Sequence, residues 1–185
     1  GLGDVYKRQA DQCASLLAEA NRRRLIASQP VADSEGSCPL HNVVRVANFG
    51  SVTLSSSFLA SCPLALSSAL YVEQQAKPLT RQLMASDLRQ IDHLGSFACR
   101  NIYHRQQARR SEHATADALD VSGFRLADGR RVSVLQGWRS ETSHPWLAAL
   151  LNNSCHYFGN ALGPEYNAAH ANHFHLGMRG QGFCF

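Results

Sequence analysis

Residues 118–135 read ALDVSGFRLADGRRVSVL, and this stretch decides the expected fold. Two β-prone runs, 118–124 and 131–135, are joined by Ala127-Asp128-Gly129, which is a turn signal. Further along, apolar residues at helical spacing predict a helix over 145–158, and residues 173–178 predict a last short strand. Helices that lie before and between a few strands favour an α+β fold, with a small antiparallel sheet flanked by helices.

The first half of the chain shows more helix than strand. Spaced leucine and alanine residues predict a helix over 11–28, followed by a loop over 29–38. Residues 42–55 contain two alternating runs, which predict a β-hairpin or two short strands. Residues 62–85 predict one long helix, or two helices split at Pro78. The apolar face of this helix comprises Leu64, Leu66, Leu70 and Val72.

The bulk composition excludes several classes of protein. A chain of 185 residues can form one compact domain. The net charge of +4 comes from dispersed basic residues rather than a stripe, so we expect no nucleic-acid partner. A weakly basic surface suits an anionic polymer such as a cell wall. No apolar run reaches about 18 residues, which predicts no membrane span.

The six cysteines are spread along the chain without a C-x-x-C pair, which favours disulfides over a metal-binding cysteine site. The expected pairs include Cys155–Cys184 and Cys38–Cys62. Disulfides imply an oxidising compartment, so the expected location is periplasmic or extracellular. The alternative is a cytosolic protein with six reduced, buried thiols.

The first nine residues are expected to lie outside the natural fold. Residues 4–9, DVYKRQ, resemble the in-frame translation of a sequencing adapter, so we interpret 1–9 as a cloning or assembly scar on a truncated gene that lacks its export signal. The expected division of the rest is an N-terminal helix and loop over 10–37 and a single globular domain over 38–185.

Two short segments, 111–120 (SEHATADALD) and 170–175 (HANHFH), contain the residues with the clearest chemistry. Side chains alternate along a strand, so His173 and His175 point to the same side. His113 precedes a strand in which the Asp120 carboxylate has apolar neighbours, where a carboxylate without a partner is costly. Two histidines, a carboxylate and an open position form a catalytic zinc composition.

Each of these residues also has an ordinary structural explanation. A lone H-x-H is common in proteins without a metal. His113 can be a surface residue, and Asp120 can be a cap or turn residue. No G-x-S-x-G motif is present, so a serine hydrolase is not expected.

The two segments together resemble the zinc peptidases that cut peptidoglycan peptides, in which S-x-H-x6-D is followed by H-x-H. Residues 38–185 more closely resemble the bacterial extensin-like protein C-terminal domain family. The motifs that carry this resemblance are Gly95–Arg100, Ser111–Thr115, Ala118–Val121, Gly123-Phe124, Trp138, Leu162–Pro164, Asn167-Ala168, His170 and His173–Leu176.

The resemblance implies a murein zinc-peptidase-like fold in which the sheet carries a zinc ion. Its implied ligands are His113, Asp120 and His175. The resemblance also implies that His170 and His173 lie beside the metal, as in the H-x-x-H-x-H version found in murein endopeptidases.

The implied reaction is hydrolysis of peptide bonds in peptidoglycan stem peptides or cross-links. Zinc lowers the pKa of water toward about 7, and a basic side chain takes the proton and passes it to the leaving amine. His173 is the expected base. Arg100 is the candidate for binding a substrate carboxylate or the developing oxyanion, and a structural ion pair beside Cys99 is the alternative.

Asn172 and Gly177 stand where the resemblance leads us to expect acidic residues. Related dipeptidases have their catalytic glutamate at the position of Asn172, and an amide cannot act as a base. Either His173 or Glu112 then takes the proton, or the chain is a catalytically impaired, zinc-containing peptidoglycan-binding domain. A disulfide-rich structural domain without metal is a third alternative. The expected partners are peptidoglycan peptides, and the chain is expected to be a monomer.

Overall fold

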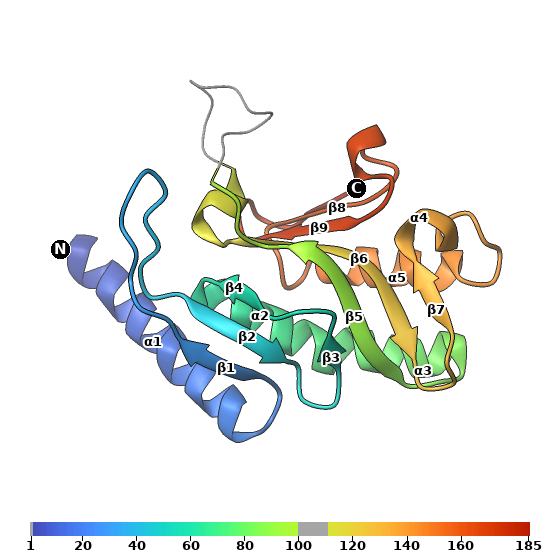
Figure 1. Cartoon of the computed structure of the whole chain (residues 1–185), viewed down its shortest axis with the longest axis horizontal. Helices are drawn as coiled ribbons and strands as arrows, with labels where there is room; N and C mark the ends of the chain where they lie inside the picture. Colours follow the sequence, from blue (N-terminus) through green and yellow to red (C-terminus); the bar gives the residue numbers. More distant parts are fainter. Residues whose placement is uncertain (1, 100–110) are drawn as a thin grey trace.

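The 118–135 segment lies at the centre of the larger of two β-sheets (Figure 1). The structure is a computed structural model that describes residues 2–99 and 111–185, with side chains from residue 9 onward. Strand β6 (Ala118–Leu126) pairs with β5 (Leu88–Gly95) along one edge. Its other edge pairs with β9 (Phe174–Gly177) over the first half and with β7 (Arg131–Ser133) over the second. All these pairs are antiparallel, as predicted.

The ends of this sheet differ from the prediction of a small antiparallel sheet. Beyond β9 lie β8 (Asn160–Leu162) and β10 (Phe183–Cys184), which pair with each other in parallel. At the opposite end β3 (Thr53–Leu54) pairs with β5, also in parallel. The sheet has seven strands and is mixed. β10 follows β9, so the predicted last strand is not the last.

A second, antiparallel sheet contains β1 (Ala27–Pro30), β2 (Val44–Asn48) and β4 (Phe58–Ala60). Residues 42–55 therefore form two short strands rather than a hairpin, because β2 belongs to this sheet and β3 to the larger one. The loop predicted over 29–38 is partly wrong, since its first two residues belong to β1 and pair with β2.

The positions of the helices are predicted more accurately than the residues at which they end. The predicted helix over 62–85 is continuous but contains one π-turn. The π-turn ends at Ala76, two residues before Pro78. Pro78 has no backbone N–H, so it cannot donate the hydrogen bond of a regular α-helix at this point. None of the helices among the described residues is long and apolar enough to cross a membrane. The α-helical and π-helical segments of the described residues are α1 (Leu2–Arg22), α2 (Cys62–Tyr71), η1 (Val72–Ala76), α3 (Lys77–Met84), α4 (Val134–Gly137) and α5 (His144–Ser154).

Three predicted elements end early. The helix predicted over 11–28 stops at Arg22, because the chain turns at Arg24, which has a φ of 59°, and residues 27 and 28 belong to β1. The strand predicted over 131–135 stops at Ser133, because the Ser133 side chain accepts a hydrogen bond from the Gln136 N–H and caps α4. The helix predicted over 145–158 stops at Ser154, because the next residues form the turn that leads the chain back into β8. Phe158 is still buried in the core.

Helices α3 and α5 cover one face of the larger sheet and lie behind it in Figure 1. Trp146 of α5 is fully buried and donates a hydrogen bond from Nε1 to Thr80 Oγ1 of α3 at 3.1 Å. Its ring lies 5.2 Å from that of Phe124 on β6. Leu119 and Val121 of β6 are buried in the same core. Alternation along β6 therefore turns Asp120 to the opposite face, which we call the open face.

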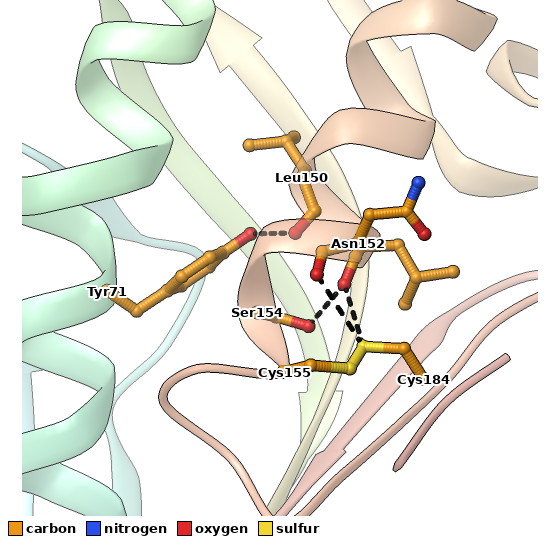
Figure 2. Close-up of a disulfide and its surroundings, with 7 residues drawn as sticks. Tyr71, Leu150, Asn152, Ser154, Cys155 and Cys184 are labelled. Carbon is orange, nitrogen blue, oxygen red and sulfur yellow. Dashed lines mark hydrogen bonds between the residues drawn. A yellow bond between two sulfur atoms is a disulfide. The ribbon is translucent and has the colours of Figure 1, made fainter. Parts of the chain in front are cut away.

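All six cysteines form disulfides. The predicted Cys155–Cys184 pair is confirmed. It joins the end of α5 to β10 (Figure 2). The Cys184 sulfur lies 3.4 Å from the Leu151 carbonyl oxygen. In the same view the buried Tyr71 hydroxyl donates to the Leu150 carbonyl at 2.7 Å, which links α2 to α5.

The predicted Cys38–Cys62 pair is wrong. Cys62 opens α2, which packs along α1, so its partner is Cys13, with 6.2 Å between the Cα atoms. Cys38 pairs with Cys99. Three disulfides in a chain of this size are typical of secreted proteins.

Removing the Cys13–Cys62 disulfide should lower stability measurably. The two residues are 49 positions apart, and the chain-entropy cost of closing a loop of that length is about 4 kcal/mol. We expect Cys13→Ser with Cys62→Ser to lower the free energy of unfolding by roughly this amount in urea denaturation. The matched variant Cys155→Ser with Cys184→Ser removes a disulfide that joins residues only 29 positions apart. Its free energy of unfolding should therefore fall by slightly less. An unchanged urea midpoint in the first variant would contradict the assigned pairing.

Candidate metal centre

The pairing of β6 with β9 brings Asp120 and His175 together. The two residues stand directly opposite each other in the register of this antiparallel pair. Residues in that position point to the same face, with Cβ atoms about 4.5–5.5 Å apart. His175 Nδ1 donates a hydrogen bond to Asp120 Oδ1 at 3.1 Å. The ladder of backbone hydrogen bonds thus fixes one imidazole against one carboxylate on the open face.

His113 reaches the same carboxylate from a short 3-10 helix, η3 (Glu112–Thr115). The Ser111 hydroxyl caps this turn by accepting from the His113 N–H at 3.2 Å. His113 Nε2 lies 3.1 Å from Asp120 Oδ2, and Nδ1 donates to the Ser96 carbonyl at 2.9 Å. Because a carbonyl can only accept, Nδ1 carries the proton, and Nε2 is the nitrogen that faces the site.

The donor atoms of His113, Asp120 and His175 all lie within 4.8 Å of one another. The three side chains are largely buried, with 10%, 17% and 12% of their surface exposed. Two imidazole nitrogens and one carboxylate oxygen suit zinc and leave a coordination position open. In both imidazoles the other ring nitrogen donates to a protein oxygen, which is the usual arrangement in metal-binding histidines. The donor set therefore fits a zinc ion, and these residues can hold one.

Glu112 contacts His175 on the side of the ring that faces away from Asp120. Its Oε1 accepts from His175 Nε2 at 3.0 Å and from Asn160 Nδ2 at 2.9 Å. Its Oε2 accepts from the Arg179 N–H at 2.8 Å. A carboxylate with three donors is held firmly, and it fixes the orientation of the His175 ring. This geometry favours a positioning role for Glu112 over the role of a base.

Gly177 explains how the Glu112 carboxylate fits. A Cβ atom at this position would lie 2.4 Å from both carboxylate oxygens of Glu112. Gly177 is also buried, so a side chain there could not turn into solvent. The absence of a side chain at residue 177 is thus a requirement of the Glu112–His175 contact.

The other two predicted histidines lie beside this group. His173 Nε2 is 3.8 Å from Asp120 Oδ1, and its Nδ1 lies 2.8 Å from Asn172 Oδ1. The His170 ring is centred 5.0 Å from that of His173 and 6.2 Å from that of His175. All the predicted site residues among the described part of the chain therefore gather in one place. Arg100 lies outside the described residues.

Sequence reasoning missed the residues that support the ligands. Ser96 contributes a backbone carbonyl and Arg179 a backbone N–H, and side-chain patterns carry no signal for such groups. Asn160 lies on β8 and donates to Glu112, but nothing in the surrounding sequence marks it. These contacts form because segments that are distant in the sequence pack beside one another next to β6.

Hydrogen bonds inside the site shift the pKa values of its buried groups. Burial alone would raise the pKa of the Asp120 and Glu112 carboxyls, but the hydrogen bonds that they accept outweigh it and hold both pKa values below their ordinary range. Burial would lower the pKa of His175, yet its bonds to the two carboxylates raise that pKa to about 9. Without a bound cation, His175 is therefore protonated at neutral pH.

The pKa values of His170 and His173 move the other way. Burial, together with the positive charge of the neighbouring imidazoles, lowers the pKa of His170 to about 4. Burial also lowers the pKa of His173, although the Asp120 carboxylate opposes this shift. Both rings are neutral at neutral pH and have a nitrogen that can accept a proton.

Comparison with known proteins identifies the family. The profile of the family described as extensin-like protein C-terminus matches residues 11–185, almost the whole chain. The chain therefore belongs to this family, as the motifs predicted. The match begins upstream of residue 38, where the predicted resemblance starts, and so includes part of α1. No curated protein and no solved structure matches the chain.

Gly177→Ala should weaken metal binding. The added methyl group displaces the Glu112 carboxylate from His175, and loss of such a supporting contact typically costs about 10–100-fold in metal affinity. Zinc affinity can be measured by competition with a chromophoric chelator. Glu112→Ala removes both the clash and the contact, so adding Gly177→Ala to it should cost almost nothing further. Zinc affinity equal to that of the wild type in Gly177→Ala would contradict the assigned contact.

Stability of the metal-free protein should fall between pH 6.5 and about 9. His175 has a folded pKa of about 9, above its unfolded value of 6.5, so its contribution is complete below pH 6.5 and is lost as pH rises through 9. The full loss is at most about 3 kcal/mol. His170 and His173, with lowered pKa values, change stability only below pH 6.5.

Urea denaturation in the presence of a chelator measures this slope. His175→Gln keeps a polar side chain but does not titrate, so its stability should vary less over the same pH window. Equal slopes in the two proteins would show that another group is responsible.

Proposed function

We propose that this member of the extensin-like family is a zinc-dependent peptidase that hydrolyses peptide bonds in peptidoglycan stem peptides or cross-links. The observation that carries the proposal is the convergence of His113, Asp120 and His175, with each imidazole held at its second nitrogen. The resemblance of segments 111–120 and 170–175 to motifs of peptidoglycan zinc peptidases suggests the reaction class and the substrate. A zinc ion held there supplies Lewis acidity, which polarises a peptide carbonyl and lowers the pKa of water.

His173 is the residue placed to move a proton. With Nδ1 held by the Asn172 amide oxygen, its Nε2 faces the Asp120 side of the site. In this role His173 takes a proton at Nε2 from the attacking water and returns it to the leaving amine. Asn172 cannot replace a catalytic glutamate as a base, but its amide oxygen selects the tautomer of His173 that leaves Nε2 free to accept a proton.

Three disulfides and the net charge of +4 agree with a periplasmic or extracellular protein that meets an anionic wall polymer. We propose that the protein acts there as a monomer.

A specific observation favours a second function, a zinc-containing domain that binds peptidoglycan without cutting it. Glu112 accepts hydrogen bonds from His175, Asn160 and Arg179, so the neutral imidazoles of His170 and His173 are the remaining bases among the described residues. Of these two, His173 has the nitrogen that lies 3.8 Å from Asp120 Oδ1. If His173 does not accept the proton, the site retains the metal and the peptide but loses the reaction.

Zinc analysis combined with muropeptide digestion separates these functions. We expect one zinc per chain, new peptide products, and loss of those products with a chelator. His113→Ala should remove both metal and activity. His173→Gln should keep the zinc and lower kcat by roughly 10²–10⁴-fold, the usual contribution of a general base. His156→Gln, an exposed histidine on the loop after α5, is the matched control and should change neither.

The outcomes are distinct. Bound zinc with no product from any muropeptide would replace the peptidase by the binding domain. Less than about half an equivalent of zinc in a folded protein would overturn both metal-dependent functions. Full activity in His173→Gln would assign the base elsewhere.

A further inference from the structure

A groove lies on the open face of the larger sheet, next to the metal centre. It has a volume of about 470 Å³ and extends over β5, β6, β7 and the start of α4. The register between β5 and β6 shifts near Ser122 and reverses the alternation of β6. Arg125, which lies between the buried Phe124 and Leu126, therefore turns to the open face, as Asp120 does. The polar side chains that line it are chiefly Asp92, Ser122, Arg125, Arg131, Gln136 and Asn172.

Two arginines lie side by side in this groove. Arg125 of β6 and Arg131 of β7 are directly opposite in the antiparallel register. Such residues share a face, with Cβ atoms about 4.5–5.5 Å apart, and like charges in this position destabilise a sheet. An anion between the two guanidinium groups would turn this repulsion into attraction. The register thus places two cations where a negatively charged ligand stabilises them.

The groove keeps an excess of positive charge. Asp92 pairs with Arg125 through Nε at 3.3 Å and accepts from Gln90 Nε2 at 2.8 Å. This contact is made by Nε, and the two outer nitrogens of the Arg125 guanidinium, Nη1 and Nη2, are not part of it. Arg131 is exposed and has no carboxylate within ion-pair distance among residues 9–99 and 111–185. Two guanidinium groups and one carboxylate leave a net charge of +1.

The groove adjoins the metal centre at two points. Ser122 follows Asp120 by two residues on β6, a distance of about 7 Å along the strand. Asn172 lines the groove and also contacts His173, whose Nε2 lies near Asp120. A peptide bound with one peptide bond at the metal centre would therefore place a neighbouring group in the groove.

We propose that the Arg125–Arg131 pair binds a carboxylate group of the peptide substrate, a role that the sequence assigned only to Arg100. This inference rests on the proposed function for the nature of the ligand. A carboxylate suits the site because the planar guanidinium presents parallel N–H donors that match its two oxygens. The pair would determine which stem peptides are held, while the metal centre acts on the bond.

Binding to a pair of probes tests the subsite without requiring catalysis. The probes are a muropeptide with free carboxylates and the same peptide with those carboxylates amidated, titrated into the zinc-loaded chain by calorimetry. We expect the wild type to bind the free form at least about tenfold more tightly, as a charge-assisted hydrogen bond provides. Arg131→Gln should lose most of this preference. Arg45→Gln, an exposed arginine in the smaller sheet, is the matched control and should keep it.

A second measurement separates binding from folding. Removing one of two opposed cations relieves repulsion, so Arg131→Gln should unfold at a temperature no lower than that of the wild type. The free-carboxylate peptide should raise the unfolding temperature of the wild type more than that of the variant. Equal affinity of the wild type for the two peptides, no binding of either, or full preference in Arg131→Gln would each overturn the subsite. Preferential binding without any cleavage would support the subsite and overturn the peptidase.

Discussion

The pairing of Asp120 with His175 across β6 and β9 is the constraint on which the rest of the site depends. Because side chains alternate, a slip of one residue in this register would turn Leu119, Val121, Phe174 and Leu176 out of the core and bury the polar pair in their place. Burial of these four apolar side chains therefore holds the polar pair on the open face. The hydrophobic packing that stabilises the sheet therefore also sets the distance between the His175 imidazole and the Asp120 carboxylate.

The part of the site that lies on these strands could be predicted from sequence, because alternation in 118–124 and in H-x-H is a local pattern. Strand β5, which forms the other edge of β6, was not predicted. Its residues Arg89, Gln90, Asp92 and His93 interrupt any alternation, and it is a strand because β6 lies beside it. The two-residue strand β10 and the Cys13–Cys62 pair were not predicted for the same reason. Each depends on which distant segments lie side by side in the fold and not on local residue types. The side chain of Arg100, predicted for substrate binding, lies outside the described residues.

Glu112 and Gly177 appeared in the sequence as unrelated features, a candidate base and a missing acidic residue. The structure joins them, because the Glu112 carboxylate occupies the space where a side chain at 177 would lie. A side chain at 177 and the Glu112 carboxylate in its present position therefore exclude each other. This relation between residues 112 and 177 follows from the packing of two distant segments, and neither segment shows it alone.

Charge balance shows why such a site can fold with or without a cation. Two buried carboxylates, Asp120 and Glu112, face one imidazole, and an unpaired buried carboxylate would cost several kcal/mol. In the metal-free protein the protonated His175 ring donates its Nδ1–H to Asp120 and its Nε2–H to Glu112, so each carboxylate keeps a donor. A divalent cation at the proposed ligands would bring charge equal to that of both carboxylates and make the proton on Nδ1 unnecessary. Glu112 would keep its bond to Nε2 in either state. The contact that stabilises the metal-free form is therefore the same contact that would orient His175 toward a metal, and the ring would not have to turn to bind one.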